Sequence, residues 1–140
     1  MDESKKDALF EFYEKILEAE RAGVQSITEL LPEISDDETK SLAQIFLRDE
    51  GMNCTILSNQ IKNLGKTPGN KTGDFVEKMR ALNTLNEKLE LLVKGQEWVA
   101  KQIRYNRELP EPTSGTFFME SIKIQHEENV DKLKKKIQMK

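Results

Sequence analysis

The chain has 140 residues, of which 36% are hydrophobic and 34% are charged, and its formal net charge is −3. This length allows one domain with a sizeable core, and the balance is typical of a helical protein with charged outer faces rather than of a disordered chain. The net charge gives no electrostatic footprint for nucleic acid, so we expect no nucleic-acid partner.

The single cysteine and the single histidine limit the kinds of metal site and disulfide bond that the chain can form. One cysteine excludes an intrachain disulfide and a cysteine-based zinc site, and one histidine excludes metal sites built from several histidines of one chain. No apolar run approaches the roughly 18 residues of a membrane span. The N-terminus lacks the apolar core of a signal peptide. We therefore expect one domain over residues 1–140, in the cytoplasm and without a membrane partner.

Two helical segments are predicted in the first half of the chain. Apolar residues recur at helical spacing from about residue 4 to residue 31, where Pro32 ends the pattern, and again from residue 35 to residue 64, before Gly65. The sequence Ser35-Asp-Asp-Glu38 reads as a capping box at the start of the second segment. The short turn between the segments predicts an antiparallel helix hairpin.

The second half of the chain predicts two more helices. Residues 65–74 are rich in glycine and turn formers, and they form either an exposed turn or a long crossover. A third helical segment is expected from Asp74, with Glu77 as its capping partner, to the break at Pro110 and Pro112. A fourth is expected over residues 116–137. No segment alternates as a strand would, so the fold class is all-α: an antiparallel four-helix bundle with a longer connection between its second and third helices.

Each predicted helix carries polar residues on its apolar stripe. They are Glu20; Glu50 with Asn53; Gln96; and His126, with Lys123 at the edge. A buried carboxylate must be paired, bound to metal or protonated. Gly23, Gly51 and Gly95 stand beside these positions, and glycine inside a helix costs about 1 kcal/mol relative to alanine. These glycines indicate either that the helices approach closely or leave space for a bound ligand, or that glycine is merely tolerated at exposed positions.

This arrangement resembles the ferritin-like diiron-carboxylate proteins, in which two helices each give a glutamate and two each give Glu-x-x-His. Glu20 matches the glutamate of the first helix and Glu50 that of the second, while His126 matches the histidine of the fourth. Asn53, Gln96 and Lys123 stand where the family has a histidine and two glutamates. The segments Thr-Gly-Asp-Phe75, Lys-Gly-Gln-Glu-Trp-Val99 and His-Glu-Glu-Asn-Val130 are similar to a ferritin-like bundle family with a depleted metal site, over nearly the whole chain.

The resemblance implies a metal site made by Glu20, Glu50 and His126, with iron or manganese as the metal. It implies metal-dependent redox chemistry, or the handling of oxygen or iron. Two carboxylates would balance only half the charge of a diferrous pair. Carboxylates one position off the stripe would join the site if a helix were rotated; these are Asp49, Glu90 and Glu97.

The sequence is also compatible with two other functions. The chain could be a metal-free structural or interaction bundle, whose polar core forms a hydrogen-bond network that includes Lys123. Alternatively, it could use the polar core to bind a small molecule. Trp98 and Tyr105 lie away from the apolar stripe and predict either a homodimer contact or packing beneath the long loop. Cys54 is expected to be a small core residue rather than a nucleophile. The sequence does not decide whether the protein is an enzyme.

Overall fold

The computed structural model describes residues 2–106 and 114–138, and every regular element in these ranges is a helix. The elements in chain order are α1 (Glu3–Leu30), the 3-10 helix η1 (Leu31–Glu33), α2 (Asp37–Asn63), α3 (Phe75–Arg80), α4 (Leu85–Arg104) and α5 (Ser114–Ile137). The prediction of an all-α protein is confirmed. Within the described ranges, no helix is both long enough and apolar enough to cross a lipid bilayer.

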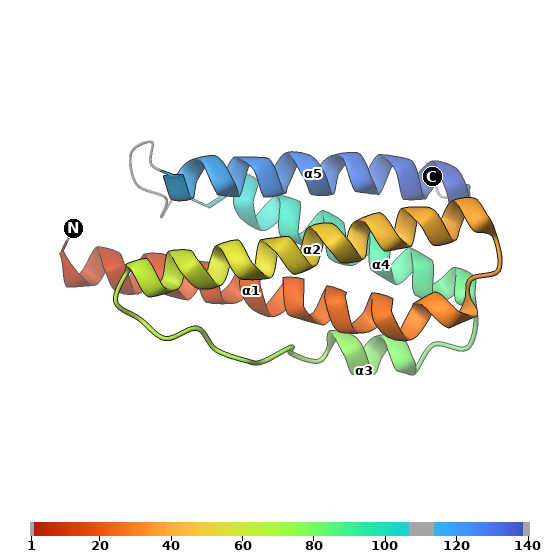
Figure 1. The fold of residues 1–140 in the computed structure, drawn as a ribbon, viewed down its shortest axis with the longest axis horizontal. Coiled ribbons are helices and arrows are strands. Elements are labelled where there is room, and N and C mark those ends of the chain that lie inside the picture. Colours follow the sequence, from red (N-terminus) through yellow and green to blue (C-terminus); the bar gives the residue numbers. More distant parts are fainter. Residues whose placement is uncertain (1, 107–113, 139–140) are drawn as a thin grey trace.

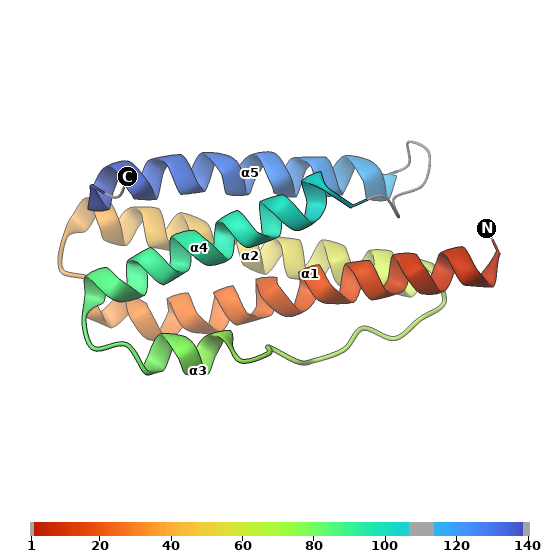
Figure 2. The same ribbon diagram turned by 180° about the vertical axis from the view of Figure 1, so that it is seen from behind.

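Four long helices lie side by side (Figures 1 and 2). α1 packs along α2 and α4 packs along α5, while contacts of α1 with α4 and of α2 with α5 join the two pairs. The helices of each pair run in opposite directions (Figure 1). The short helix α3 packs on the outside of α1. This arrangement is compatible with the predicted bundle. The expected break at Pro110 and Pro112 lies outside the described residues.

The turn between α1 and α2 is short, and its cap differs from the predicted one. α1 ends at Leu30, and Pro32 falls inside η1. The N-cap of α2 is Asp36, whose Oδ2 accepts a hydrogen bond from the amide of Thr39 at 2.8 Å. The prediction that Ser35 caps this helix is therefore wrong by one residue. Aspartate is as good an N-cap as serine, and its negative charge also favours the positive end of the helix dipole.

Residues 65–74 form a long connection that runs beside the N-terminal half of α1 and leads to α3 (Figures 1 and 2). It leaves α2 through Gly65, whose φ of +77° is readily accessible to glycine. Lys66 Nζ pairs with Asp7 at 2.9 Å, and the amide of Gly69 donates to Glu14 Oε1 at 2.7 Å. The guanidinium of Arg21 donates to the carbonyl oxygen of Gly69. These contacts hold the connection against α1, so α2 and α4 run in the same direction.

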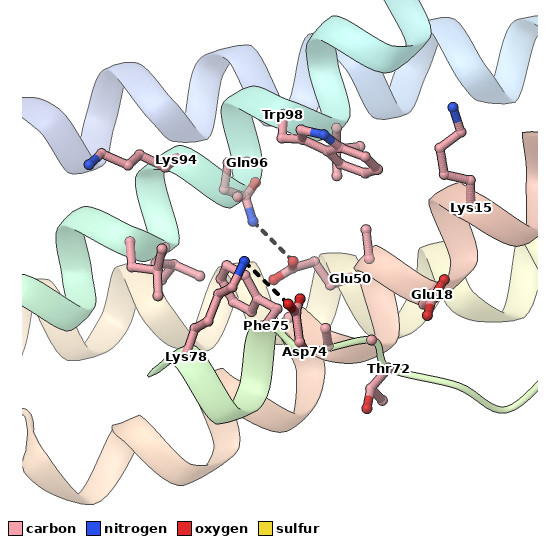
Figure 3. A pocket seen from close by; sticks show the side chains of 18 residues that line it. Lys15, Glu18, Glu50, Thr72, Asp74, Phe75, Lys78, Lys94, Gln96 and Trp98 are labelled. Carbon is pink, nitrogen blue, oxygen red and sulfur yellow. Dashed lines mark hydrogen bonds and ion pairs between the residues drawn. The ribbon is translucent and has the colours of Figure 1, made fainter. Parts of the chain in front are cut away.

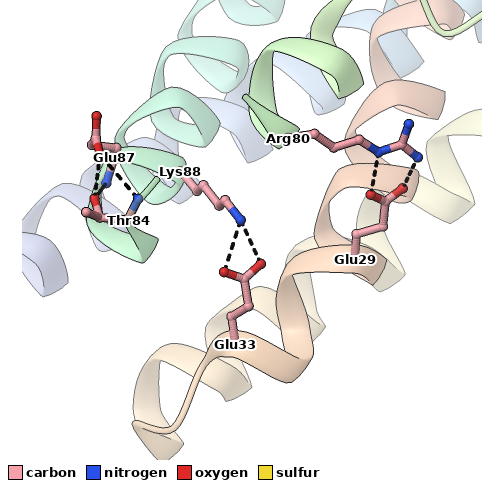
Figure 4. Close-up of polar contacts among 6 residues, drawn as sticks. All are labelled: Glu29, Glu33, Arg80, Thr84, Glu87 and Lys88. Carbon is pink, nitrogen blue, oxygen red and sulfur yellow. Dashed lines mark hydrogen bonds and ion pairs between the residues drawn. The ribbon is translucent and has the colours of Figure 1, made fainter. Parts of the chain in front are cut away.

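The prediction of one continuous helix from Asp74 to the proline-rich break is wrong, because the chain forms α3 and then restarts as α4. The restart is a capping box, in which Thr84 Oγ1 accepts from the amide of Glu87 at 3.1 Å and the Glu87 carboxylate bonds back to Thr84. Ion pairs fasten both sides of the break to the first hairpin (Figure 4): Arg80 with Glu29 at 2.7 Å, and Lys88 with Glu33 at 2.9 Å.

Replacing Thr84 with alanine is expected to destabilise the protein by about 1 kcal/mol, because the first turn of α4 would lose its side-chain acceptor. Urea unfolding measures the change. Thr55→Ala is the matched control, since Thr55 is an exposed residue inside α2 and alanine suits a helix interior better. An equal effect of the two substitutions would contradict the role of Thr84 as the cap of α4.

Most of the buried apolar residues form two clusters. The first consists of Leu9, Phe12, Tyr13, Ile16, Leu17, Leu57, Ile61, Val99, Ile103, Met119 and Ile122. The second consists of Ile27, Leu30, Ile34, Ala43, Phe46, Met79, Leu89, Leu92, Val93 and Leu133. Along each long helix, buried polar residues stand between the two clusters. We call the polar layer the set of Glu20, Glu50, Asn53, Gln96, His126 and Asn129; the buried Ser26 of α1 stands beside Ile27 of the second cluster and is not counted in the layer.

Candidate functional site

The centre of the polar layer brings together two carboxylates and the imidazole. Glu20 comes from α1, Glu50 from α2 and His126 from α5, and one ligand atom of each lies within 4.8 Å of the others. All three side chains are buried, with relative exposures of 0%, 3% and 0%. Each residue stands on the core stripe of its helix, and the helices bring the three stripes to the same level. Three potential metal ligands therefore meet inside the core.

Hydrogen bonds connect this cluster to its polar neighbours. His126 Nε2 donates to Glu20 Oε1 at 2.7 Å, and Asn53 Nδ2 donates to Glu20 Oε2 at 2.9 Å. Asn53 Nδ2 also lies 2.7 Å from Gln125 Oε1. Gln96 Nε2 donates to Glu50 Oε1 at 3.0 Å (Figure 3). Both oxygens of Glu20 are thus engaged, whereas Glu50 Oε2 has no hydrogen-bond partner among the described residues.

Glu50 is the electrostatically strained member of the cluster. Burial raises the pKa of its carboxyl well above the ordinary value of 4.5, and the neighbouring Glu20 carboxylate raises it further. The hydrogen bond from Gln96 opposes this shift. Among the described residues, no lysine or arginine forms an ion pair with Glu20 or Glu50. The Glu50 carboxylate therefore needs a proton or an external cation to offset the cost of its burial.

The three glycines noted in the sequence differ in what surrounds them. A Cβ added at Gly23 would lie 2.1 Å from Glu50 Oε1, so this glycine gives the carboxylate its space. A Cβ at Gly95 would lie 3.0 Å from the ring of Phe75, so the glycine lets α3 approach α4. Nothing lies within 4 Å of a Cβ added at Gly51, which fits tolerance at an open position. Only Gly23 is linked directly to the cluster.

Several charged candidates stay outside the cluster. Lys123 is half-buried, and its Nζ lies 3.0 Å from Glu120 Oε2 rather than against Glu20 or Glu50. The off-stripe carboxylates also have other partners: Arg48 for Asp49, Asn86 for Glu90 and Lys134 for Glu97. The expected network that included Lys123 is therefore corrected, since this lysine forms its ion pair within α5.

The sequence analysis did not predict two residues of the site. Asn129 is 3% exposed and stands three residues after His126, on the same face of α5. Its helical spacing from His126 was the available signal. Asn129 Nδ2 and His126 Nδ1 are both buried without a hydrogen-bond partner among the described residues. The other missed residue is the half-buried Gln125, which bonds to Asn53.

Cys54 lies against the core, and Trp98 lies at a cavity on the side of the bundle. Cys54 packs against the first apolar cluster, and burial raises the pKa of its thiol to about 12, which suits a core residue rather than a nucleophile. Trp98 is 42% exposed and lines a cavity next to residues 72–75, at the end of the long connection. Tyr105 is 73% exposed.

That cavity has a volume of about 520 Å³ and extends to Glu50 and Gln96. Its walls come from α1, α3, α4 and the end of the 65–74 connection, and α2 contributes Glu50 (Figure 3). The polar layer is thus bordered by apolar clusters along the helix axes and by a cavity on one side.

The donor set fits one divalent transition-metal ion better than a pair of ions. Two glutamates would balance the charge of one such ion, whereas a pair would leave half of its charge unbalanced. No further carboxylate of the described chain joins the cluster. Carboxylate oxygen suits manganese and imidazole nitrogen suits iron, so a mixed set accommodates either. The unpartnered Glu50 Oε2 supplies a further free lone pair at the site.

These observations define an all-helical protein with a carboxylate–histidine cluster buried between two apolar halves. The chain belongs to the family described as a domain of unknown function, DUF6306, whose model matches residues 7–135. All members of the polar layer fall inside this range. Comparisons with curated proteins and with solved structures give no match.

Proposed function

We propose that this chain is a ferritin-like four-helix-bundle protein that binds one divalent iron or manganese ion through Glu20, Glu50 and His126. Its function would be metal-dependent redox chemistry, or the handling of oxygen or iron. The observation that carries the proposal is the convergence of these three buried side chains, with ligand atoms within 4.8 Å of one another.

The helix arrangement supports the ferritin-like part of the proposal. α1 with α2 and α4 with α5 form antiparallel pairs, and a long connection beside α1 separates them (Figure 1). Ferritin-like folds are four-helix bundles with one long crossover, and their ligands project inward from all four helices. In this chain α4 contributes Gln96 at the position where the resemblance expects a glutamate, which supports a reduced ligand set.

The chain's own residues would prepare and protect the bound ion. Asn53 orients Glu20 and Gln96 orients Glu50, since each amide donates to the respective carboxylate. His126 Nε2–H donates a hydrogen bond to Glu20 Oε1, and a metal held by both side chains would take the place of that hydrogen. The apolar clusters would limit the access of water along the helix axes, while the cavity beside Glu50 leaves one side open. The bound ion would supply the redox change.

Metal uptake tests the proposal. After metal removal and anaerobic incubation with Fe²⁺ or with Mn²⁺, elemental analysis is expected to find one ion per chain. Glu20→Gln and His126→Gln are each expected to abolish this uptake, because each removes a ligand. Glu11→Gln is the matched control, since Glu11 is exposed on α1. Uptake by the wild type that is no greater than uptake by Glu20→Gln would refute the metal site.

A metal-free interaction bundle is the second candidate, and the hydrogen bonds favour it. Both oxygens of Glu20 are satisfied by His126 and Asn53, and Glu50 has Gln96, so most of the layer is paired without an ion. A protonated Glu50 would remove the buried negative charge, while Gln96 Oε1, His126 Nδ1 and Asn129 Nδ2 would stay without a hydrogen-bond partner among the described residues. Under this alternative the polar layer would specify the register of the helices. The exposed Trp98 and Tyr105 would then mark a surface for a partner or for a second copy of the chain.

A further inference from the structure

The cavity beside Glu50 has the size and lining of a small-molecule site. Its volume of about 520 Å³ falls within the usual range for ligand pockets, roughly 300–1,000 Å³. Apolar and aromatic side chains make up much of its wall, including Phe75, Leu91, Leu92 and Trp98. A ligand with an apolar or aromatic body would be covered on several sides here.

Two buried hydrogen-bond acceptors without a partner among the described residues belong to side chains that line the cavity. Glu50 Oε2 and Gln96 Oε1 are buried, both residues line the cavity, and neither atom has a partner among the described residues. The orientation of the Gln96 amide is fixed, because its Nε2 donates to Glu50 Oε1 at 3.0 Å (Figure 3). A flipped amide would place two acceptor oxygens against each other. A ligand must therefore bring donors to these two acceptors.

We propose that the cavity binds a small primary amine with an aromatic or apolar body, and that its ammonium group donates to Glu50 Oε2 and Gln96 Oε1. An ammonium carries three N–H donors, which is enough for both acceptors. It also supplies the positive charge that the Glu50 carboxylate lacks. The aromatic rings of Phe75 and Trp98, which line the cavity, favour a cationic ligand as well. This site shares Glu50 with the proposed metal site, so an amine and a metal ion would compete for it; the amine proposal does not require that the chain binds metal, and it is tested on metal-free protein.

The lysines of the lining do not supply this charge to Glu50. Lys78 Nζ pairs with Asp74 at 3.3 Å, and Lys15 Nζ donates to Gln102 at 3.1 Å. Lys94, the third lysine of the lining, forms no ion pair with Glu50. An acidic ligand would instead use these lysines at the mouth of the cavity. The two ligand classes can therefore be told apart by experiment.

Trp98 provides a direct signal, because it is the only tryptophan of the chain and it lines the cavity. Metal-free protein is titrated at neutral pH with 2-phenylethylamine, 2-phenylethanol and 3-phenylpropionate, while tryptophan fluorescence is recorded. These probes share a body and differ in the end group. The amine is expected to give a saturable change with an affinity about tenfold higher than that of the alcohol, since hydrogen bonds between charged groups are the stronger ones.

Two variants test the acceptors. Glu50→Gln and Gln96→Leu are each expected to weaken amine binding about tenfold. Glu11→Gln is the matched control on the exposed face of α1, and it is expected to bind the amine as the wild type does. Circular dichroism verifies that each variant is folded. Because Gln96 is not among the proposed metal ligands, its variant separates a failure of this proposal from a failure of the metal site.

Three outcomes would overturn the proposal. In the first, 3-phenylpropionate binds as tightly as the amine, so that the lysines at the mouth select anions. In the second, no probe gives a saturable change in Trp98 fluorescence. In the third, both folded variants bind the amine as tightly as the wild type does.

Discussion

Replacing Glu50 with glutamine is expected to stabilise the metal-free protein while abolishing its uptake of metal. Glutamine keeps the acceptor for Gln96 and nearly the same shape, but it removes a buried carboxylate that has an unpartnered oxygen. The amide nitrogen takes the place of the unpartnered oxygen, so the benefit comes from the loss of the buried negative charge, and we expect a gain of about 1–3 kcal/mol at neutral pH. Urea unfolding of both proteins without metal measures the gain.

The pH dependence of this gain provides an internal check. Because the pKa of Glu50 is raised in the folded state, the folded protein holds a proton that the unfolded chain releases near pH 4.5. The stability of the metal-free wild type is therefore expected to fall as the pH rises from 4.5 through the folded-state pKa. The Glu50→Gln variant lacks this titrating group, so its stability should not show this fall. The unfolding free energies of the wild type and of Glu50→Gln should therefore converge as the pH is lowered toward 4.5.

Two controls accompany this prediction. Glu11→Gln removes one negative charge from the exposed face of α1 and is expected to change stability by less than about 0.5 kcal/mol. With saturating metal the order of stability should reverse, because only the wild type gains free energy from binding. A Glu50→Gln variant less stable than the metal-free wild type at neutral pH would mean that the Glu50 carboxylate has a compensating partner.

Replacing Gly23 with alanine is expected to displace the Glu50 carboxylate and to reduce metal uptake sharply. The new methyl group would lie 2.1 Å from Glu50 Oε1 and 2.8 Å from Cδ, so the side chain has to move. Overpacking of this kind costs about 1–3 kcal/mol. The higher helix propensity of alanine offsets about 1 kcal/mol of that cost. Urea unfolding and elemental analysis give the two readouts.

Gly51→Ala is the matched control for Gly23→Ala, because both glycines lie inside long helices. Nothing lies within 4 Å of the Cβ added at Gly51, so this variant is expected to gain up to about 1 kcal/mol and to bind metal normally. If Gly23→Ala matched Gly51→Ala in both stability and metal uptake, the close contact between Gly23 and Glu50 would be absent in solution.

Helical periodicity identified most of the polar layer before the fold was known. Glu20, Glu50, Asn53, Gln96 and His126 each fall on an apolar stripe, and all five are buried in the structure. A helix has one buried stripe, so a polar residue on that stripe is placed in the core by its spacing alone. The same reasoning predicted that these residues come from the four long helices.

Other features depend on information that periodicity lacks. Lys123 stands at the edge of the stripe, and its long flexible side chain reaches Glu120 instead of the core. The break between α3 and α4 follows from the cap at Thr84, which outweighs the apolar spacing on either side. The cavity depends on where the connection and α3 come to lie against α1 and α4, which is set by contacts distant in sequence.

The way the polar layer divides the core has a consequence for folding cooperativity. Every long helix contributes residues to both apolar clusters: α1 provides Ile16 and Ile27, and α2 provides Leu57 and Phe46. Neither half can melt while the other keeps its helices whole, so the layer is not a boundary between independently folding units. A ligand that stabilises the layer therefore protects the amide hydrogens of both halves from exchange with solvent.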